Sequence, residues 1–248
     1  MENAPVINLT FHNRAPGADP EVFQRYLKWR EEVYGPMLIK IPEVKELDNN
    51  EIIRDSLEYP HYGSILHWEN LQAREMHLKT TEAKAVNDEL NAWVKRGIRE
   101  TIWSKTYMLI KSFRSGKAYS ASQRDTRIDN APIVSLEAFR LSDEEQEKYF
   151  NWFNEFGCSS FVPLFMKLPG LKGYDWYQAT GLPPSLDLRE HEYPKYLSMI
   201  YFENIQAFEN FVESSELAAF LKMMGSVFPY GLNYKWYVQY QLTKSWRK

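Results

Sequence analysis

Short runs in which apolar and polar residues alternate are separated by longer runs with a helical spacing. Residues Val6–His12 alternate with a period of two, which is typical of a strand. From Asp19 to about Lys40, apolar residues recur every three or four positions, which predicts an amphipathic helix. Asp19 and Pro20 form a good helix start, and Pro36 suggests a kink near the end.

The same two patterns continue to the end of the chain. In the first half we expect further strands over 44–53, 61–68 and 101–113, and a second helix over 70–96. In the second half we expect strands over 133–140, 171–178, 194–202 and 233–246, and helices over 142–167 and 204–225. Each half therefore reads as βαββαβ.

A motif repeat supports this division of the chain. Residues 36–45 (PMLIKIPEVK) return as residues 163–172 (PLFMKLPGLK), which gives the shared pattern P-x3-K-[IL]-P-x-[VL]-K. A repeat of this period indicates two copies of one domain. We predict a first repeat over 1–113, a polar linker over 114–131 and a second repeat over 132–248. The spacing between matching positions grows along the chain, so the second copy carries insertions, one of them near Gly157.

The order βαββαβ predicts an α+β fold of the ferredoxin-like kind. In that fold four antiparallel strands form a sheet with both helices on one face. The other face needs cover, and the sheet of the second copy can supply it. We therefore predict that the two antiparallel sheets pack together as an intramolecular α+β barrel, which is a self-contained pseudo-dimer. Further homodimerisation stays open.

Composition narrows the partners. The net charge is −3, which argues against nucleic acid, because phosphate binding favours a basic surface. Aromatic residues make up 15% of the chain, which fits thick cores or an aromatic-lined cavity. The only cysteine, Cys158, needs no oxidising compartment. Neither a secretory signal nor a long apolar run is present, so we expect a cytoplasmic protein without a membrane partner.

The chain resembles a known superfamily. The repeated proline–lysine motif, the βαββαβ order and the SSELAAF segment (residues 214–220) are similar to dimeric α+β barrel proteins, especially EthD-like domains. That resemblance covers both halves and implies the fold. The superfamily includes cofactor-independent monooxygenases, isomerases, cyclases and haem enzymes, so the resemblance does not identify the reaction. EthD-like domains often carry a histidine two residues before the motif proline, and this chain has Tyr34 and Phe161 there.

Five residues are candidates for catalysis. Glu137 lies in the middle of an apolar run predicted to be a central strand, where desolvation would raise its pKa and suit it to acid/base work. Its counterpart in the first copy is Thr10. Histidines His67 and His12 can move protons near neutral pH, and Tyr201 matches His67 in the second copy. Tyr34 could donate to an oxyanion. Each also has a structural interpretation, as a bonded carboxylate, a boundary histidine or a packed tyrosine.

Aromatic side chains are the candidates for substrate binding: Trp29, Trp68, Trp152, Trp176, Tyr107 and Trp236. The five histidines show no zinc spacing, so we expect no metal site. We expect no bound cofactor, although haem stays an alternative through His77 or His67.

The sequence thus predicts an enzyme for a small apolar or aromatic molecule. The reaction would be acid/base isomerisation, cyclisation or lyase chemistry, or cofactor-independent oxygenation. Two alternatives remain, namely a non-catalytic ligand-binding or stress-related module and a haem-binding protein.

Overall fold

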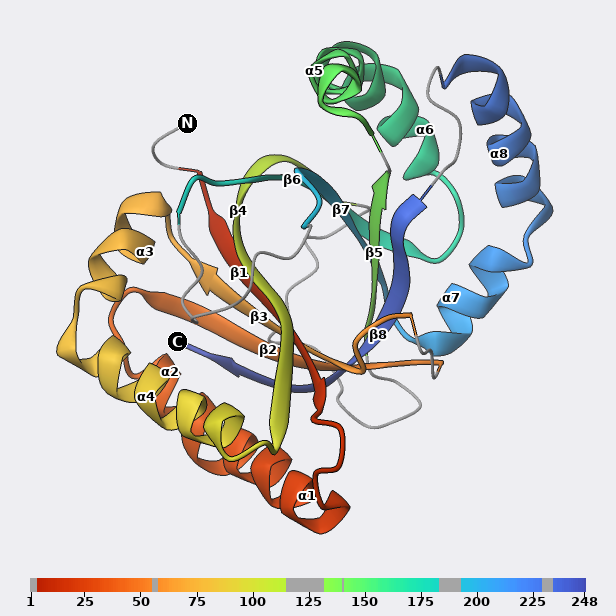
Figure 1. Ribbon diagram of the computed structural model, residues 1–248. Coiled ribbons are helices and arrows are strands. Elements are labelled where there is room, and N and C mark those ends of the chain that lie inside the picture. The colour runs from red at the N-terminus through yellow and green to blue at the C-terminus, as the bar shows by residue number, and fades with distance from the viewer. Residues whose placement is uncertain (1–3, 55–57, 115–131, 140, 183–192, 229–233) are drawn as a thin grey trace. The chain divides into compact units, whose positions relative to one another are not determined.

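The computed structural model describes residues 4–54, 58–114, 132–139, 141–182, 193–228 and 234–248. The first half follows the predicted order with extra breaks in its helices (Figure 1). Its elements are β1 (Val6–Arg14), α1 (Pro20–Trp29), η1 (Arg30–Tyr34), α2 (Gly35–Ile39), β2 (Val44–Ile52), β3 (Tyr62–Trp68), α3 (Leu71–Leu78), α4 (Thr81–Lys95) and β4 (Arg99–Arg114).

The second half repeats this order. Its elements are β5 (Ile133–Phe139), α5 (Asp143–Trp152), η3 (Phe153–Phe161), α6 (Val162–Phe165), β6 (Leu171–Ala179), β7 (Tyr196–Phe202), α7 (Ile205–Val212), α8 (Ser215–Val227) and β8 (Tyr234–Arg247). Apart from Arg114, the predicted linker lies outside the described residues, and the predicted repeat boundaries stay a prediction. No helix within the described ranges is long and apolar enough to cross a membrane.

Hydrogen-bonded strands follow one another in the order β1-β3-β2-β8-β5-β7-β6-β4 and close into a barrel. The pairings of β1 with β3 and of β5 with β7 are antiparallel, as are those of β2 with β3 and of β6 with β7. The predicted fold class is confirmed, because an α+β chain forms a closed antiparallel barrel from two βαββαβ repeats.

The chain divides into two compact units, and strands β4 and β8 each contribute several residues to both of them. The first unit contains residues 1–109, 179–193 and 242–248, and the second contains residues 110–178 and 194–241. The end of β4 therefore belongs to the second unit, and the end of β8 belongs to the first. Each unit therefore consists mainly of one repeat and includes a strand end from the other half.

Strand register shows that the two repeats match residue by residue. Thr10 on β1 pairs with Ser64 on β3, and Glu137 on β5 pairs with Ser198 on β7. At the other end of the same strands, Val6 pairs with Trp68 and Ile133 pairs with Phe202. Thr10 is thus the structural counterpart of Glu137, as the sequence predicted.

The predicted single helices are broken at equivalent places, which corrects the sequence interpretation. The helix predicted over 70–96 ends at Leu78 and restarts after Thr80, whose side chain accepts a hydrogen bond from the Ala83 amide. In the second repeat, Ser214 caps α8 in the same way. A cap of this kind starts a new helix even where the apolar spacing continues.

The first helix of each repeat contains a π-helical segment. It spans five residues in η1 and nine residues in η3. The insertion predicted near Gly157 is therefore accommodated within a wider helical turn. Such segments are rare and are often found at functional sites.

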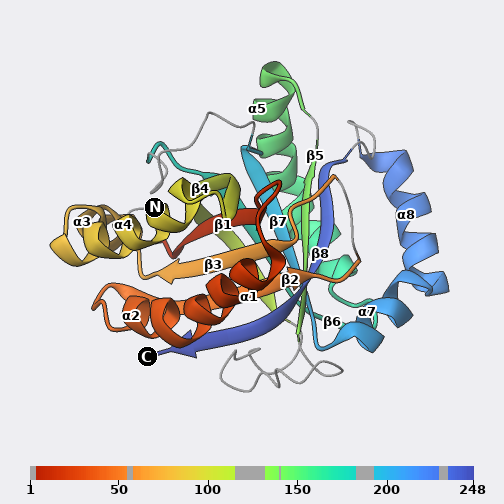
Figure 2. The same cartoon turned by 60° about the horizontal axis from the view of Figure 1, so that its bottom comes forward.

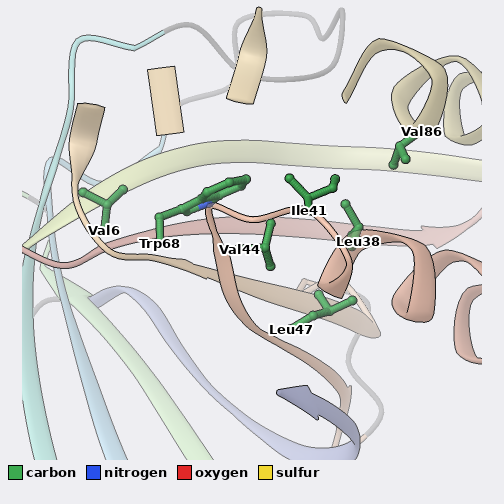
Figure 3. Close-up of a cluster of buried hydrophobic side chains, with 7 residues drawn as sticks. All are labelled: Val6, Leu38, Ile41, Val44, Leu47, Trp68 and Val86. Carbon is green, nitrogen blue, oxygen red and sulfur yellow. The ribbon is translucent and has the colours of Figure 1, made fainter. Parts of the chain in front are cut away.

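Helices cover one face of the strands within each unit. In Figures 1 and 2, helices α1 to α4 lie along one side of strands β1 to β3. Figure 3 shows the apolar cluster between these layers, formed by Val6, Leu38, Ile41, Val44, Leu47, Trp68 and Val86. The cavities described below lie in this same layer of their units.

Candidate functional site

A cavity of about 190 Å³ lies in the second unit, and we call it the second cavity. Most of its wall is aromatic or aliphatic: Phe139, Trp152, Phe153, Phe161, Phe165, Tyr174, Ile200, Phe211, Leu217, Phe220, Leu221, Met224, Phe228 and Tyr237. Glu137 and Ser198 complete the lining, and Glu137 supplies the only carboxyl group among the described residues that line it. An apolar site with few polar groups is the usual form of a small-molecule pocket.

Glu137 enters this cavity because of its position on β5. Its neighbours across the strands are Ser198 on β7 and Tyr237 on β8. The side chain is partly accessible, because it faces the cavity. The Ser135 hydroxyl donates a hydrogen bond to Glu137 Oε1 at 3.4 Å, and Gln239 in turn donates to Ser135 at 3.1 Å.

Burial among aromatic side chains raises the pKa of Glu137 to about 7, whereas the Ser135 hydrogen bond lowers it. Desolvation outweighs that one long bond, because the ionised carboxylate has little else to solvate it. Near neutral pH both protonation states are then populated. A carboxyl group in this state can either accept or donate a proton.

Two hydroxyl groups lie beside Glu137 in the second cavity. The Tyr174 hydroxyl and Ser198 Oγ are 2.5 Å apart, and either can be the donor. Burial raises the pKa of Tyr174 well above its usual value, so the phenol keeps its proton. One hydrogen of the pair is used between the two oxygens, and the other is available to a ligand.

The equivalent position in the first unit is different. A cavity of about 40 Å³, which we call the first cavity, is lined by Thr10 in place of Glu137. Thr10 Oγ1 bonds to Ser104 Oγ at 2.9 Å and accepts from Asn8 at 3.1 Å. This network leaves no acid at the place where the second unit has one.

Basic side chains line the first cavity. Arg30, Arg74 and Arg99 all contribute to its wall, and none of them is more than 4% exposed. Arg30 donates to His12 at 3.0 Å, to Asn49 at 2.7 Å and to Ser64 at 2.5 Å. The two repeats have therefore acquired cavities of opposite chemical character.

His12 and Tyr34 belong to this basic region. His12 is fully buried, and burial together with Arg30 and Arg99 lowers its pKa well below the usual value. It is therefore neutral and accepts from Arg30. Tyr34 lines the first cavity, and burial raises its pKa although Arg99, Arg30 and Arg74 favour the phenolate.

The structure does not bring His67 or Tyr201 to either cavity wall. Residues alternate along a strand, and Ser198 and Ile200 face the second cavity, so Tyr201 faces the opposite side of the sheet. There Arg114 lies over its ring at 5.3 Å. On β3, Ser64 and Leu66 face the first cavity, so His67 points to the other side of the sheet. Its Nε2 lies 3.7 Å from Asp48 Oδ2.

His67 contributes to an acidic cluster that the sequence did not indicate. Glu46, Asp48 and His67 present ligand atoms within 4.8 Å of one another, a spacing that can hold a metal ion. However, Arg247 already binds Glu46 through two hydrogen bonds of 2.8 Å. The i, i+2 spacing on β2 places the Glu46 and Asp48 carboxylates on one face. The sequence did not indicate the cluster because His67 lies on another strand, β3.

Of the six aromatic residues proposed to bind substrate, Trp152 lines the second cavity. Trp68, Trp176, Tyr107 and Trp236 are buried core residues. Trp29 packs against Tyr34 and Trp93, with ring centroids 5.3 and 5.7 Å apart. Phenylalanines are instead the largest group among the described residues that line the second cavity, and most of them come from the helical layer.

Neither histidine considered for haem fits that group. Haem needs an axial ligand facing a pocket of several hundred Å³. His77 faces the first cavity of about 40 Å³ and packs on Trp68 at 4.6 Å. His67 faces away from the first cavity, with its Nε2 3.7 Å from Asp48 Oδ2, and no histidine is among the described residues that line the second cavity.

Solved structures share this architecture over nearly the whole chain. An anthrone oxidase-like protein aligns with 99% of this chain and 93% of its own, with 11% identity and a TM-score of 0.60. A provisionally named monooxygenase from Fusobacterium nucleatum covers 100% of this chain and 96% of its own, with 11% identity and a TM-score of 0.59. A provisionally named chlorite dismutase covers 98% and 96%, with 9% identity and a TM-score of 0.57.

The chain has the dimeric α+β barrel fold. At identities near 10% the likeness shows the fold alone. No protein-family model matches the chain, and no curated protein sequence matches it.

The basic first cavity was not predicted from the sequence. One signal was present, because Arg30 falls on the apolar side of the first predicted helix. Arg74 and Arg99 gave no such signal. They come from a different helix and from a strand start, and only the tertiary fold brings them to the same cavity.

Proposed function

We propose that the second cavity is the active site of a small-molecule enzyme in which Glu137 transfers protons. The observation that carries the proposal is a carboxyl group with a pKa of about 7 that lines an aromatic cavity of about 190 Å³. A general acid or base works best when its pKa is near the operating pH. Perturbed carboxyl groups in clefts are typical of functional sites.

The cavity sets the size and polarity of the substrate. An apolar cavity of roughly 150 Å³ holds one benzene ring, so the second cavity suits a molecule of about that size. Ionised Glu137 takes a proton from a carbon or phenol made acidic by a neighbouring carbonyl group. The Tyr174–Ser198 pair donates a hydrogen bond to the oxygen on which negative charge then develops.

Two reactions can follow from that proton transfer. Protonated Glu137 can return the proton to another atom of the substrate, which gives an isomerisation or supports a cyclisation or an elimination. Alternatively, molecular oxygen can oxidise the substrate anion without a cofactor. The names of the anthrone oxidase-like neighbour and the provisionally named monooxygenase favour the second course.

Membership of the EthD-like group is part of this proposal, as are a cytoplasmic location and a small apolar partner. The repeated motif supports the membership. The position of the usual family histidine borders a cavity in both units, because Tyr34 lines the first cavity and Phe161 lines the second. Since neither residue is a histidine, Glu137 supplies the proton transfer.

The test uses one-ring aryl ketones and phenols in D2O. Proton NMR measures the exchange of the acidic C–H of the ketones, and an oxygen electrode follows O2 uptake with both classes. We expect catalysis of exchange or oxygen uptake that falls at least about a hundredfold in Glu137→Gln, the range seen for loss of a general base. Ligand binding, measured by tryptophan fluorescence, should remain.

Glu213→Gln is the matched control, because Glu213 is an exposed glutamate of the same unit. Equal rates in wild type and Glu137→Gln would overturn the role of Glu137. Binding without exchange or oxygen uptake in the wild type would instead favour the non-catalytic ligand-binding module, which the apolar Phe161 also suits.

A further inference from the structure

The first cavity holds an unusual concentration of buried positive charge. Arg30, Arg74 and Arg99 line about 40 Å³ of space, and Arg74 and Arg99 are each 2% exposed. No Asp or Glu is among the described residues that line it. Buried charges normally have a partner of opposite sign, because leaving them unpaired is strongly unfavourable.

The three arginines differ in how far their donors are used. Arg30 is engaged by neutral acceptors on His12, Asn49 and Ser64. By contrast, Nε of Arg74 and both Nε and Nη1 of Arg99 are buried without a hydrogen-bond acceptor in the described part of the chain. These donors are thus available to a ligand.

Aromatic rings hold the two under-used arginines in place. Arg74 lies over the Trp68 ring at 5.1 Å, and Arg99 lies over the Tyr26 ring at 5.9 Å. The Tyr26 hydroxyl, also in the cavity wall, is buried with no partner among the described residues. Such contacts fix a guanidinium group without neutralising it.

We propose that the first cavity binds a compact oxyanion, either phosphate or a small carboxylate, between Arg74 and Arg99. Guanidinium groups are the preferred protein donors for both anions. A water needs roughly 10–15 Å³ of such space, so the cavity has room for an anion of a few heavy atoms. Tyr34 and Tyr26 present further hydroxyl groups in the cavity wall.

This site is separate from the proposed active site, which lies in the other unit. The two proposals can therefore fail independently. Glu137→Gln should leave anion binding unchanged, whereas loss of an arginine should leave the Glu137 cavity intact. The variants should act independently because the basic cavity and the apolar cavity that contains Glu137 occupy equivalent places in two different repeats.

Isothermal titration calorimetry with inorganic phosphate, and separately with acetate, tests the proposal in chloride-free buffer. We expect one saturable site per chain for at least one of the two anions, and the anion that binds identifies the class. Arg99→Gln and Arg74→Gln should each weaken binding by at least about tenfold, because each removes a charge-assisted hydrogen bond. Arg99→Lys should recover part of the affinity.

Arg25→Gln is the matched control, since Arg25 is an exposed arginine of α1, and it should bind as the wild type does. Tyr34→Phe gives a milder variant if the arginine changes prevent folding, and it should weaken binding a few-fold. Absence of saturable binding of both anions to the wild type would overturn the proposal. So would unchanged binding in the folded arginine variants.

Discussion

At the scale of single residues, Glu137 has an unusual relation to pH. Its pKa is about 7 in the folded chain and would be near 4.5 in the unfolded chain. A group whose pKa is raised by folding contributes stability that is fully present below the unfolded pKa. That contribution is lost as the pH rises through the folded pKa.

We therefore predict that, as the pH rises from about 4.5 to about 7, the unfolding free energy of the wild type falls relative to that of Glu137→Gln. The difference should reach up to about 3 kcal/mol, because one pKa unit corresponds to about 1.4 kcal/mol. Urea unfolding of both proteins at pH 5 and pH 8 measures it. An equal difference at the two pH values would contradict the raised pKa, and Glu213→Gln should show no such change.

The sequence predicted that Glu137 lies on a central strand. It could not predict which side chains surround the carboxyl group. The apolar run around Glu137 predicted its strand, and the repeat predicted its counterpart Thr10. Its desolvation depends on Phe220 and Met224 of α8, more than eighty residues away in the chain. The same limit applies to Arg74 and Arg99, because local periodicity carries no information about which elements share a cavity.

At the scale of elements, caps decide where the helices break. The strand positions were predicted to within a few residues, since each strand is a short run rich in apolar residues. The helix breaks were missed, because apolar spacing continues through Thr80 and Ser214. The cap bonds from the Ala83 and Leu217 amides to these side chains, both 3.1 Å long, interrupt the longer predicted helices.

We predict that Thr80→Ala and Ser214→Ala each lower the unfolding free energy by about 1 kcal/mol, the usual effect of losing an N-cap. Ser215→Ala is the control, because its hydroxyl bonds to the exposed Glu216. Urea unfolding measures the three changes. A loss in Ser215→Ala as large as that in Ser214→Ala would show that the caps are not responsible.

Two helical glycines should respond to alanine in opposite ways. A Cβ on Gly35 would lie 2.6 Å from the Trp246 ring, whereas a Cβ on Gly225 would meet nothing within 4 Å. We predict that Gly35→Ala destabilises by about 1–3 kcal/mol through overpacking. Gly225→Ala should stabilise by up to about 1 kcal/mol through helix propensity. Thermal unfolding measures whether each variant is more or less stable than the wild type. A more stable Gly35→Ala variant would contradict the packing of Trp246 of β8 against Gly35 of α2.

At the scale of the whole molecule, the ends of β4 and β8 complete the opposite repeat. Residues 242–248 belong to the first unit. In that unit Thr243 bonds to the Asn49 carbonyl at 3.1 Å, and Arg247 binds Glu46 through two bonds of 2.8 Å. The repeat order was readable from the sequence, but this exchange of strand ends was not.

We predict that a chain ending at Gln241 loses protection mainly in the first unit. Hydrogen exchange should rise in β2 (Val44–Ile52), because β8 no longer pairs there. Exchange in β7 (Tyr196–Phe202) should change less. A chain ending at Trp246, which keeps Thr243, serves as the milder control. A uniform rise in both units, or none in β2, would contradict the division into units.

The central claim is that the second repeat holds a carboxyl group poised between its two protonation states in an aromatic cavity. Carbon-13 NMR of the side-chain carboxyl groups in the full-length protein, with Glu137→Gln to assign the resonance, tests it most directly. A midpoint near pH 7 for Glu137 is the expected result. A midpoint near 4.5, as in a solvated glutamate, would remove the basis for acid/base chemistry in this cavity.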